Sequence, residues 1–186
     1  MTTHQDLWQY ARTLADLGDL TADWLEGGNS YLPAYLPSQD GKIRPADETV
    51  SLIPHLARAN RNGFVTTSSQ PGVALADCSG QRAFVGGFCT ADTAERIQDA
   101  CLGTDLIAIA TPPAWENPTR IAVSIRDAKP CTWAGAVVSV VDIGVYYGED
   151  CPRAVASLFL AWQVAIIDPA WGRARLLWER LDAAWK

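Results

Sequence analysis

The sequence contains little histidine, a residue on which many catalytic and metal sites depend. Its 186 residues include only two histidines, His4 and His55, too few for a multi-histidine metal site or a convincing histidine-based triad. The common nucleotide-binding, serine-hydrolase and zinc-protease motifs are absent. Asp142 and Asp168 are candidate acids or bases, but lone carboxylates beside strands are commonly used by turns and caps. We therefore assign no catalytic residue and no metal ligand.

The cysteines do not indicate a disulfide framework or a structural zinc site. They number five, an odd count, and include no C-x-x-C pair, which favours buried free thiols in a reducing compartment. The first six residues have neither the basic nor the apolar region of a signal peptide. The longest apolar stretch, 154–167, is shorter than the about 20 residues of a membrane span. We expect a cytoplasmic protein with no membrane partner.

Basic residues are also in the minority. Lysine and arginine total 15 against 21 aspartates and glutamates, for a net charge of −6. A protein that binds the phosphate backbone needs a basic face, so we expect no nucleic-acid partner. With 48% hydrophobic residues, the chain can bury a sizeable core, and its length suits one domain over residues 1–186.

Hydrophobic periodicity and β-branched runs predict an α+β fold, a mixed β-sheet flanked by about five helices at the two ends of the chain. Gly18 is the expected weak point of the first helix, Thr90 the cap of a middle helix, and residues 29–45 a loop. The valine-rich segment 136–145 is apolar on both faces, which favours a central strand. The predicted helices are 6–26, 47–61, 91–102, 152–166 and 171–185, and the predicted strands are 64–67, 82–88, 106–111, 121–126 and 136–145.

Two polar clusters and two tryptophans are candidates for binding a ligand. The run Thr66-Thr67-Ser68-Ser69-Gln70 leads from a strand end into a loop, where hydroxyls and backbone amides commonly hold small polar ligands. The alternative is a turn closed by side-chain-to-backbone bonds. Cys131-Thr132-Trp133 forms the second cluster at the start of a strand. Of the eight tryptophans, Trp115 and Trp133 lie outside the predicted helices, where an aromatic face can line a cavity or attract a cation.

A series of motifs adds a family resemblance. Asp47-Glu48-Thr49 at a helix start is followed by the segment 58–71, which contains Asn60-Arg61-Asn62-Gly63 and Ser69-Gln70-Pro71, and then by Gln81-Arg82-Ala83-Phe84. Thr132-Trp133 before a valine-rich segment and the tryptophans of the closing region extend the pattern. Together these motifs resemble the C-terminal regulatory domain of eukaryotic methylenetetrahydrofolate reductase. The sequence also resembles small actinobacterial and phage proteins that share the Ser-Gln-Pro-Gly element, a likeness that implies no activity.

The reductase domain binds S-adenosylmethionine and S-adenosylhomocysteine. The resemblance therefore implies a stand-alone module, a sensor or sequestering protein, for these or related adenosyl compounds, with no further cofactor. It places ligand contacts at Glu48, Thr49, Thr66 and Thr132, and the reductase domain's dimerisation implies a homodimer. The neighbouring polar residues and the aromatic ring complete the predicted set of ligand-binding residues: Glu48, Thr49, Thr66, Thr67, Ser69, Gln70, Thr132 and Trp133.

The chain also departs from the reductase pattern. It has no counterpart of the catalytic barrel, so flavin and folate chemistry do not carry over, and the insertion after Ser-Gln-Pro is shortened to residues 72–80. Two alternatives to the binding module stay open. One is an enzyme, a lyase or hydrolase, that degrades such a ligand, with Glu48, Asp142 or Asp168 as acid or base. The other is a protein-interaction module that has lost the pocket and binds a partner chain through its tryptophan-rich helices.

Overall fold

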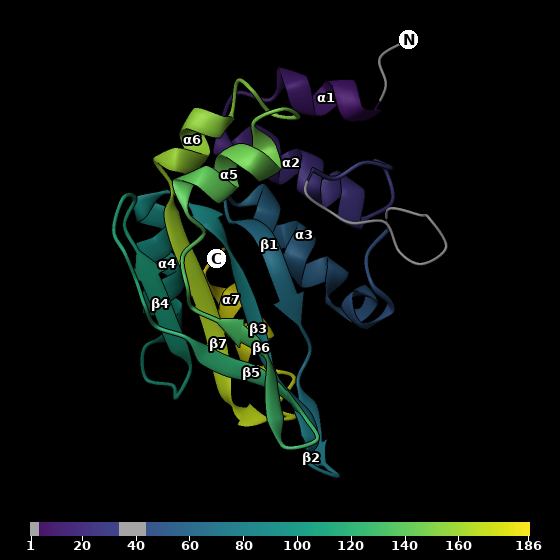
Figure 1. Ribbon diagram of the computed structural model, residues 1–186, viewed down its shortest axis with the longest axis vertical. Helices are drawn as coiled ribbons and strands as arrows, with labels where there is room; N and C mark the ends of the chain where they lie inside the picture. The colour runs from purple at the N-terminus through teal and green to yellow at the C-terminus, as the bar shows by residue number, and fades with distance from the viewer. Residues whose placement is uncertain (1–3, 34–43) are drawn as a thin grey trace.

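The structure is a computed structural model that describes residues 4–33 and 44–186. Part of the predicted 29–45 loop lies outside these residues. The helices are α1 (His4–Tyr10), α2 (Leu14–Leu25), the 3-10 helix η1 (Asp47–Leu52), α3 (Ile53–Arg61), α4 (Ala91–Cys101), α5 (Val140–Tyr147), α6 (Val155–Phe159) and α7 (Leu176–Ala183) (Figure 1). The strands are β1 (Val65–Gln70), β2 (Val73–Ala76), β3 (Ser79–Cys89), β4 (Ile107–Thr111), β5 (Ile121–Arg126), β6 (Lys129–Ala134) and β7 (Trp162–Trp171).

The long strand β3 joins the whole sheet. Its first residues pair with β2 and β5, and its last residues pair with β1 and β7. β4 lies beyond β7, and β6 lies beyond β5. The predicted α+β class is therefore confirmed. The sheet was expected to be mixed, whereas all pairs among the described strands are antiparallel.

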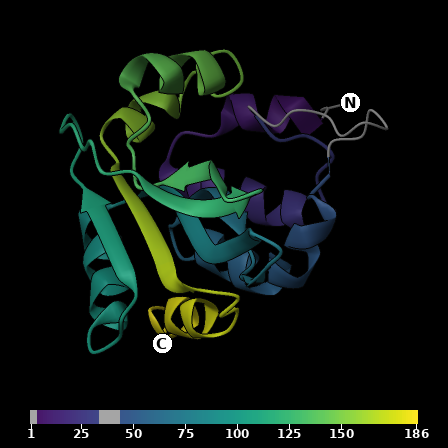
Figure 2. The same cartoon turned by 60° about the horizontal axis from the view of Figure 1, so that its bottom comes forward.

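Each face of the sheet is covered differently. One face packs against α2, α3, α4 and α7 through a core that includes Val85 of β3 and Ile166 of β7. On the other face, α1, α2, α5 and α6 cover one end around Phe88. The β5–β6 hairpin covers the other end around Phe84 and Ile167, and Figure 2 shows it lying across the sheet. Two separate clusters therefore share this second face, with β3 running beneath both.

Several predicted elements are confirmed. Helix α3 has Pro54 in its first turn and ends before Gly63, whose φ of 85° is in the left-handed region. The Thr90 side chain caps α4 by accepting a hydrogen bond from the Thr93 amide. The strands predicted at 82–88, 106–111 and 121–126 correspond to β3, β4 and β5.

The predicted helix 6–26 is interrupted between Tyr10 and Leu14 and not at Gly18. Thr13 and Asp16 form a capping box that starts a new helix, α2, after α1 has ended at Tyr10. Gly18 does not break the helix but lies inside α2. The position needs a glycine because a Cβ there would overlap the carbonyl oxygen of Asn60 on α3. The missing side chain is what lets the two helices cross closely.

The central strand was predicted in the wrong segment. Residues 136–145 form an irregular stretch and the start of α5, where Ser139 caps the helix through the Asp142 amide. The strand that lies between β3 and β4 is β7, which overlaps the predicted helix 152–166. A strand such as β7 that is buried on both faces shows neither the two-residue period of a half-buried strand nor the 3.6-residue period of an amphipathic helix. Helix and strand are therefore easily confused there. Strands β2 and β6 were also missed.

No helix in the described ranges combines the length and apolar character that crossing a bilayer requires.

Candidate ligand-binding site

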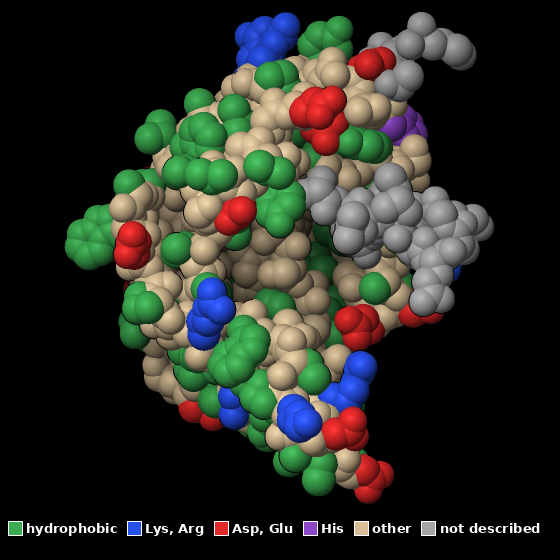
Figure 3. Space-filling view, in the orientation of Figure 1, with side chains coloured by type: hydrophobic (Ala, Val, Ile, Leu, Met, Phe, Trp, Pro, Cys, Tyr) green, Lys and Arg blue, Asp and Glu red, His purple; other side chains and the backbone are tan. Residues whose placement is uncertain are grey.

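A hollow of about 380 Å³, which we call the polar pocket, lies between the N-terminal helices and the sheet. Its volume is within the usual range for small-molecule sites. Figure 3 shows this face of the molecule hollowed near its centre. Seven of the eight predicted ligand-binding residues line the polar pocket. They are Glu48, Thr49, Thr66, Thr67, Ser69, Gln70 and Thr132.

Glu48 contributes a carboxylate that the fold leaves uncommitted. It lies on η1 and is exposed, while the amide of the neighbouring Thr49 is used by the turn, donating to the Ala46 carbonyl at 2.8 Å. Within the part of the chain that the structure describes, Glu48 has no hydrogen-bond or ion-pair partner. A carboxylate at a pocket rim without a partner can accept hydrogen bonds from hydroxyls or an ammonium group.

Asn60 fixes the orientation of Thr66. The Asn60 side chain is fully buried, and its Nδ2 donates to the Leu56 carbonyl at 2.8 Å and to Thr66 Oγ1 at 2.7 Å. Its Oδ1 accepts the Thr66 amide at 3.0 Å, which sets the amide orientation because the backbone N–H requires an acceptor. Since Thr66 Oγ1 accepts a bond from Asn60, the hydroxyl keeps its own proton for another acceptor.

A β-bulge places Thr67 at the boundary of the pocket. Thr66 pairs with Gly87 and Ser68 with Gly86, so Thr67 is the extra residue of β1. Such bulges bend a strand and redirect its side chains. The Thr67 hydroxyl reaches the Gly86 carbonyl at 3.4 Å, which is a long contact. The bulge therefore presents consecutive hydroxyls along one edge of the hollow.

Gln70 lines the pocket, but its amide nitrogen holds the sheet together. The residue is buried, and Nε2 donates to the carbonyls of Arg82 at 2.8 Å and Val123 at 2.9 Å. These bonds connect β1 to β3 and β5. Both amide protons are used, so Gln70 has no further donor to offer a ligand.

Thr132 and Trp133 are separated by the geometry of β6. Neighbouring residues of a strand point to opposite sides, and Thr132 lines the polar pocket whereas Trp133 lines an adjacent hollow. Trp133 is therefore not brought together with the other seven residues. Trp115 lies elsewhere, 70% exposed in a loop beside a third hollow.

The remaining wall of the polar pocket is largely apolar and was not predicted. Its members come from α2, α3, β3 and the segment after α2, and they are Trp24, Leu25, Leu32, Leu56 and Phe84. The helical spacing of Thr21 and Leu25 put both on one face of α2, but periodicity alone cannot tell a pocket wall from the core. Asn60, which holds Thr66 in place through two hydrogen bonds, is part of the motif on which the family resemblance rests.

Two of the three carboxylates considered as acids or bases, Asp142 and Asp168, have structural roles. Asp142 caps the start of α5 with Ser139. Asp168 is completely buried and accepts bonds from the Arg173 guanidinium at 2.7 Å and from the Ala170 amide at 2.9 Å. Neither lines the polar pocket. Among the residues described, no group of three or more metal-ligating side chains lies close enough to hold an ion.

The fold and the site define the chain as an α+β domain with a small-molecule-sized, partly polar hollow beside an antiparallel sheet. Residues 3–186 match the family model described as Domain of unknown function (DUF6919), so the chain belongs to that family. A search of curated proteins found no match.

Proposed function

We propose that the protein is a cytoplasmic binding module for S-adenosylmethionine, S-adenosylhomocysteine or a closely related adenosyl compound, acting as a sensor or by sequestering the ligand. One observation carries the proposal. The polar pocket collects residues from η1, β1 and β6, far apart in sequence, that the resemblance to the reductase regulatory domain assigns to ligand contacts. These include Glu48, Thr66 and Thr132.

The charges of the pocket suit an adenosylated amino acid. The uncommitted Glu48 carboxylate complements an ammonium or sulfonium group, and it can also accept bonds from ribose hydroxyls. A unit charge pair about 4 Å apart near a protein surface is worth about 4 kcal/mol before desolvation is subtracted. The Thr66 hydroxyl accepts a bond from Asn60 through one lone pair, and its own proton can be donated to a carboxylate or to a ring nitrogen.

The apolar wall supplies the remaining contacts. Leu32, Leu56 and Phe84 face the same hollow as the hydroxyls of β1. Such a mixture, with a few polar groups that orient the ligand and an apolar surface that buries it, is typical of small-molecule sites. No residue of the polar pocket is required to react for the ligand to be held.

Calorimetric titration with each adenosyl compound tests the proposal. Glu48→Gln is expected to weaken binding at least about tenfold, the equivalent of one lost charge-assisted hydrogen bond. Thr132→Val is expected to weaken it several-fold, and both residues are exposed, so folding is preserved. Asp47→Asn is the matched control, because Asp47 is an exposed acid on the same turn of η1 that does not line the polar pocket.

Absence of heat for both compounds at millimolar concentration, with folded protein, would refute the proposal. Equal affinities for the Glu48→Gln and Asp47→Asn variants would show that the ligand does not bind beside Glu48 in the polar pocket. Overnight incubation with product analysis separates binding from degradation, and we expect the ligand to be recovered unchanged. The homodimer that the resemblance implies is tested by light scattering, where a monomer mass at high concentration would count against it.

A further inference from the structure

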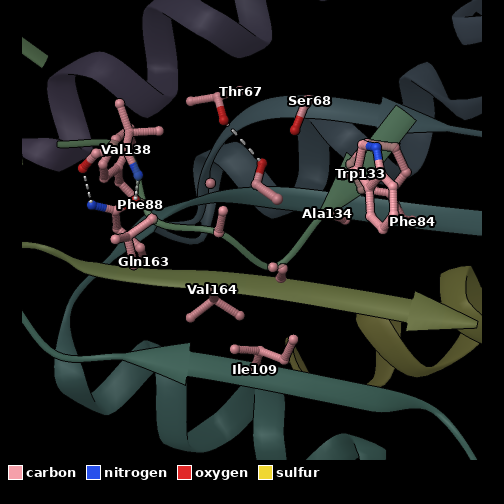
Figure 4. Close-up of a pocket in the computed structure, with 16 residues that line it drawn as sticks. Thr67, Ser68, Phe84, Phe88, Ile109, Trp133, Ala134, Val138, Gln163 and Val164 are labelled. Carbon is pink, nitrogen blue, oxygen red and sulfur yellow. Dashed lines mark hydrogen bonds between the residues drawn. The ribbon is translucent and has the colours of Figure 1, made fainter. Parts of the chain in front are cut away.

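A second hollow, of about 120 Å³, adjoins the polar pocket. The two share Thr67, Ser68 and Phe84 as lining residues. Figure 4 shows this second hollow with Thr67 and Ser68 along one side and Val164 and Ile109 along the opposite side. A ligand in the polar pocket therefore has adjacent space to enter, on the far side of the β1 bulge.

The hollow exists because a side chain is missing between two phenylalanines. Residues 84, 86 and 88 of β3 all line it, and Phe84 belongs to the cluster under the β5–β6 hairpin whereas Phe88 belongs to the cluster under α5 and α6. Gly86 lies in the gap, paired with Ser68 on one side and Ala165 on the other. The floor is consequently flat backbone with almost no side-chain volume.

Gly86 is not required by the backbone. Its φ is outside the left-handed region, and a Cβ would meet only Ser68 Oγ at 3.3 Å and the Val164 carbonyl oxygen at 3.7 Å. A larger side chain would project into the hollow and fill it. The gap is thus a feature of the surface that a single substitution can remove.

The segment 135–138, which walls the hollow, is held in place by two side-chain amides. Gln163 accepts from the Val138 amide at 2.7 Å and donates to the Val138 carbonyl at 2.8 Å, as a neighbouring strand would. Asn117 donates to the Gly135 carbonyl at 3.4 Å. Gly135 has a φ of 98°, and a Cβ there would collide with Ile109 at 2.8 Å. The wall is fixed before any ligand arrives, which lowers the entropic cost of binding.

We propose that this second hollow receives the planar heteroaromatic base of the ligand, adenine in an adenosyl compound, while the polar pocket holds the ribose and the amino acid. The inference rests on the proposed function and adds the orientation of the ligand. Among the residues that the structure describes, no ionisable side chain lines the second hollow, so it suits an uncharged group, whereas the carboxylate of Glu48 lies in the polar pocket.

The lining chemistry matches a base. A flat ring stacks on the backbone floor and against aromatic side chains, and Trp133 and Phe84 supply these. The hydroxyls of Thr67 and Ser68 face the same space (Figure 4) and can bond the polar edge of a base. Trp133 is 51% exposed, so a bound ring would cover aromatic surface that now contacts solvent.

The test measures the binding of S-adenosylhomocysteine and of adenosine to the whole protein by calorimetry. Gly86→Val fills the hollow, and Trp133→Ala removes a stacking surface that is exposed and not needed for the core. Each is expected to lower affinity for both compounds about tenfold or more. Trp115→Ala is the matched control, because Trp115 is another exposed tryptophan that lines neither hollow, and its affinities are expected to equal those of the wild type.

Wild-type affinity in the folded Gly86→Val and Trp133→Ala variants, with affinity still lost in Glu48→Gln, would overturn this inference and leave the proposed function standing. Failure of both compounds to bind the wild-type protein would overturn the two together. Circular dichroism of each variant identifies one that does not fold. If Gly86→Val is such a case, Trp133→Ala decides alone, since its side chain is half exposed on an outer strand.

Discussion

Replacing Asn60 by alanine is expected to lower the free energy of unfolding by about 3 kcal/mol. The side chain is 0% exposed and makes hydrogen bonds of 2.8, 2.7 and 3.0 Å. Its loss leaves the Thr66 amide without an acceptor, which costs about 1–3 kcal/mol, and removes two further bonds worth about 0.5–1.5 kcal/mol each. Because the Leu56 carbonyl lies inside α3, the helix itself still supplies it with a donor, and the estimate is taken from the lower half of the summed range of about 2–6 kcal/mol.

Urea denaturation followed by circular dichroism measures this change, with the slope m unchanged if the unfolded state is unaffected. For a chain of this length, about 3 kcal/mol corresponds to a drop in Tm of about 6–12 °C. Asn62→Ala is the matched control. Asn62 also donates to a carbonyl four residues earlier, that of Arg58 at 2.8 Å, but it is only partly buried. Its loss is expected to cost less than about 1 kcal/mol. Equal costs for the two variants would refute the argument that the buried network is what matters.

Asn60→Asp separates stability from ligand orientation. An aspartate can still accept the Thr66 amide, but it cannot donate to Thr66 Oγ1. The Thr66 hydroxyl would then donate its proton to the carboxylate and turn it away from the polar pocket. We expect weaker binding of the adenosyl compounds than in wild type even where the variant is folded, and unchanged affinity would show that the Thr66 proton does not contact the ligand.

Three further outcomes are expected. Gly18→Ala should destabilise the protein despite the better helix propensity of alanine, because the added Cβ would overlap Asn60. Gly144→Ala in α5, where a Cβ meets nothing within 4 Å, should stabilise the protein by about 0.5–1 kcal/mol. Melting temperatures that shift in the same direction for both variants would contradict this. Hydrogen bonds from Arg61 hold the pKa of the Glu26 carboxyl below its usual range, so this pair stabilises the fold above about pH 4.3, the unfolded glutamate value, and its contribution is lost as pH falls through the lower folded pKa. The stability difference between wild type and Glu26→Gln should be a fraction of a kcal/mol at pH 6, because both side chains are over 40% exposed, and should shrink towards pH 3; a difference that grows would reverse the sign. Iodoacetamide at pH 8 should label two thiols in the folded protein and five after unfolding, since burial raises the pKa of the buried thiols, to about 12 for two of them, and mass spectrometry counts the adducts. The exposed cysteines are Cys78 and Cys131, and the buried ones are Cys89, Cys101 and Cys151.

Local signals predicted those elements whose ends are marked by side chains. Thr90 before α4 and Gly63 after α3 satisfy terminal backbone groups directly, so a short stretch of sequence contains the information. The same kind of signal was present and overlooked at Ser139, where the spacing to Asp142 marks the start of α5. Attention to that cap would have removed the false central strand.

The placement of β7 could not be obtained in this way. This strand is buried on both faces, with Val164 and Ile166 on one face and Ile167 on the other. The burial comes from β3, β4 and helices in distant parts of the chain, and no local pattern records such contacts. The polar pocket illustrates the same limit. Its residues were predicted through a resemblance that includes long-range arrangement. The position of Trp133 in the second hollow rather than beside Thr132 could not be predicted, because β6 was not recognised and its alternation could not be applied.

Because β7 lies between β3 and β4 in the sheet and lines the second hollow, that hollow can form only after the ribosome has synthesised this late strand. During synthesis, β3 and β4 emerge well before β7, which provides a pairing edge for each of them. Until then both strands expose unpaired backbone groups, which makes the nascent chain prone to aggregate. Gly86 gains its neighbour Ala165, and Val138 gains its anchor Gln163, only when this strand arrives. A messenger that ends prematurely after α6 would therefore yield a product that lacks the floor and the fixed wall of the second hollow.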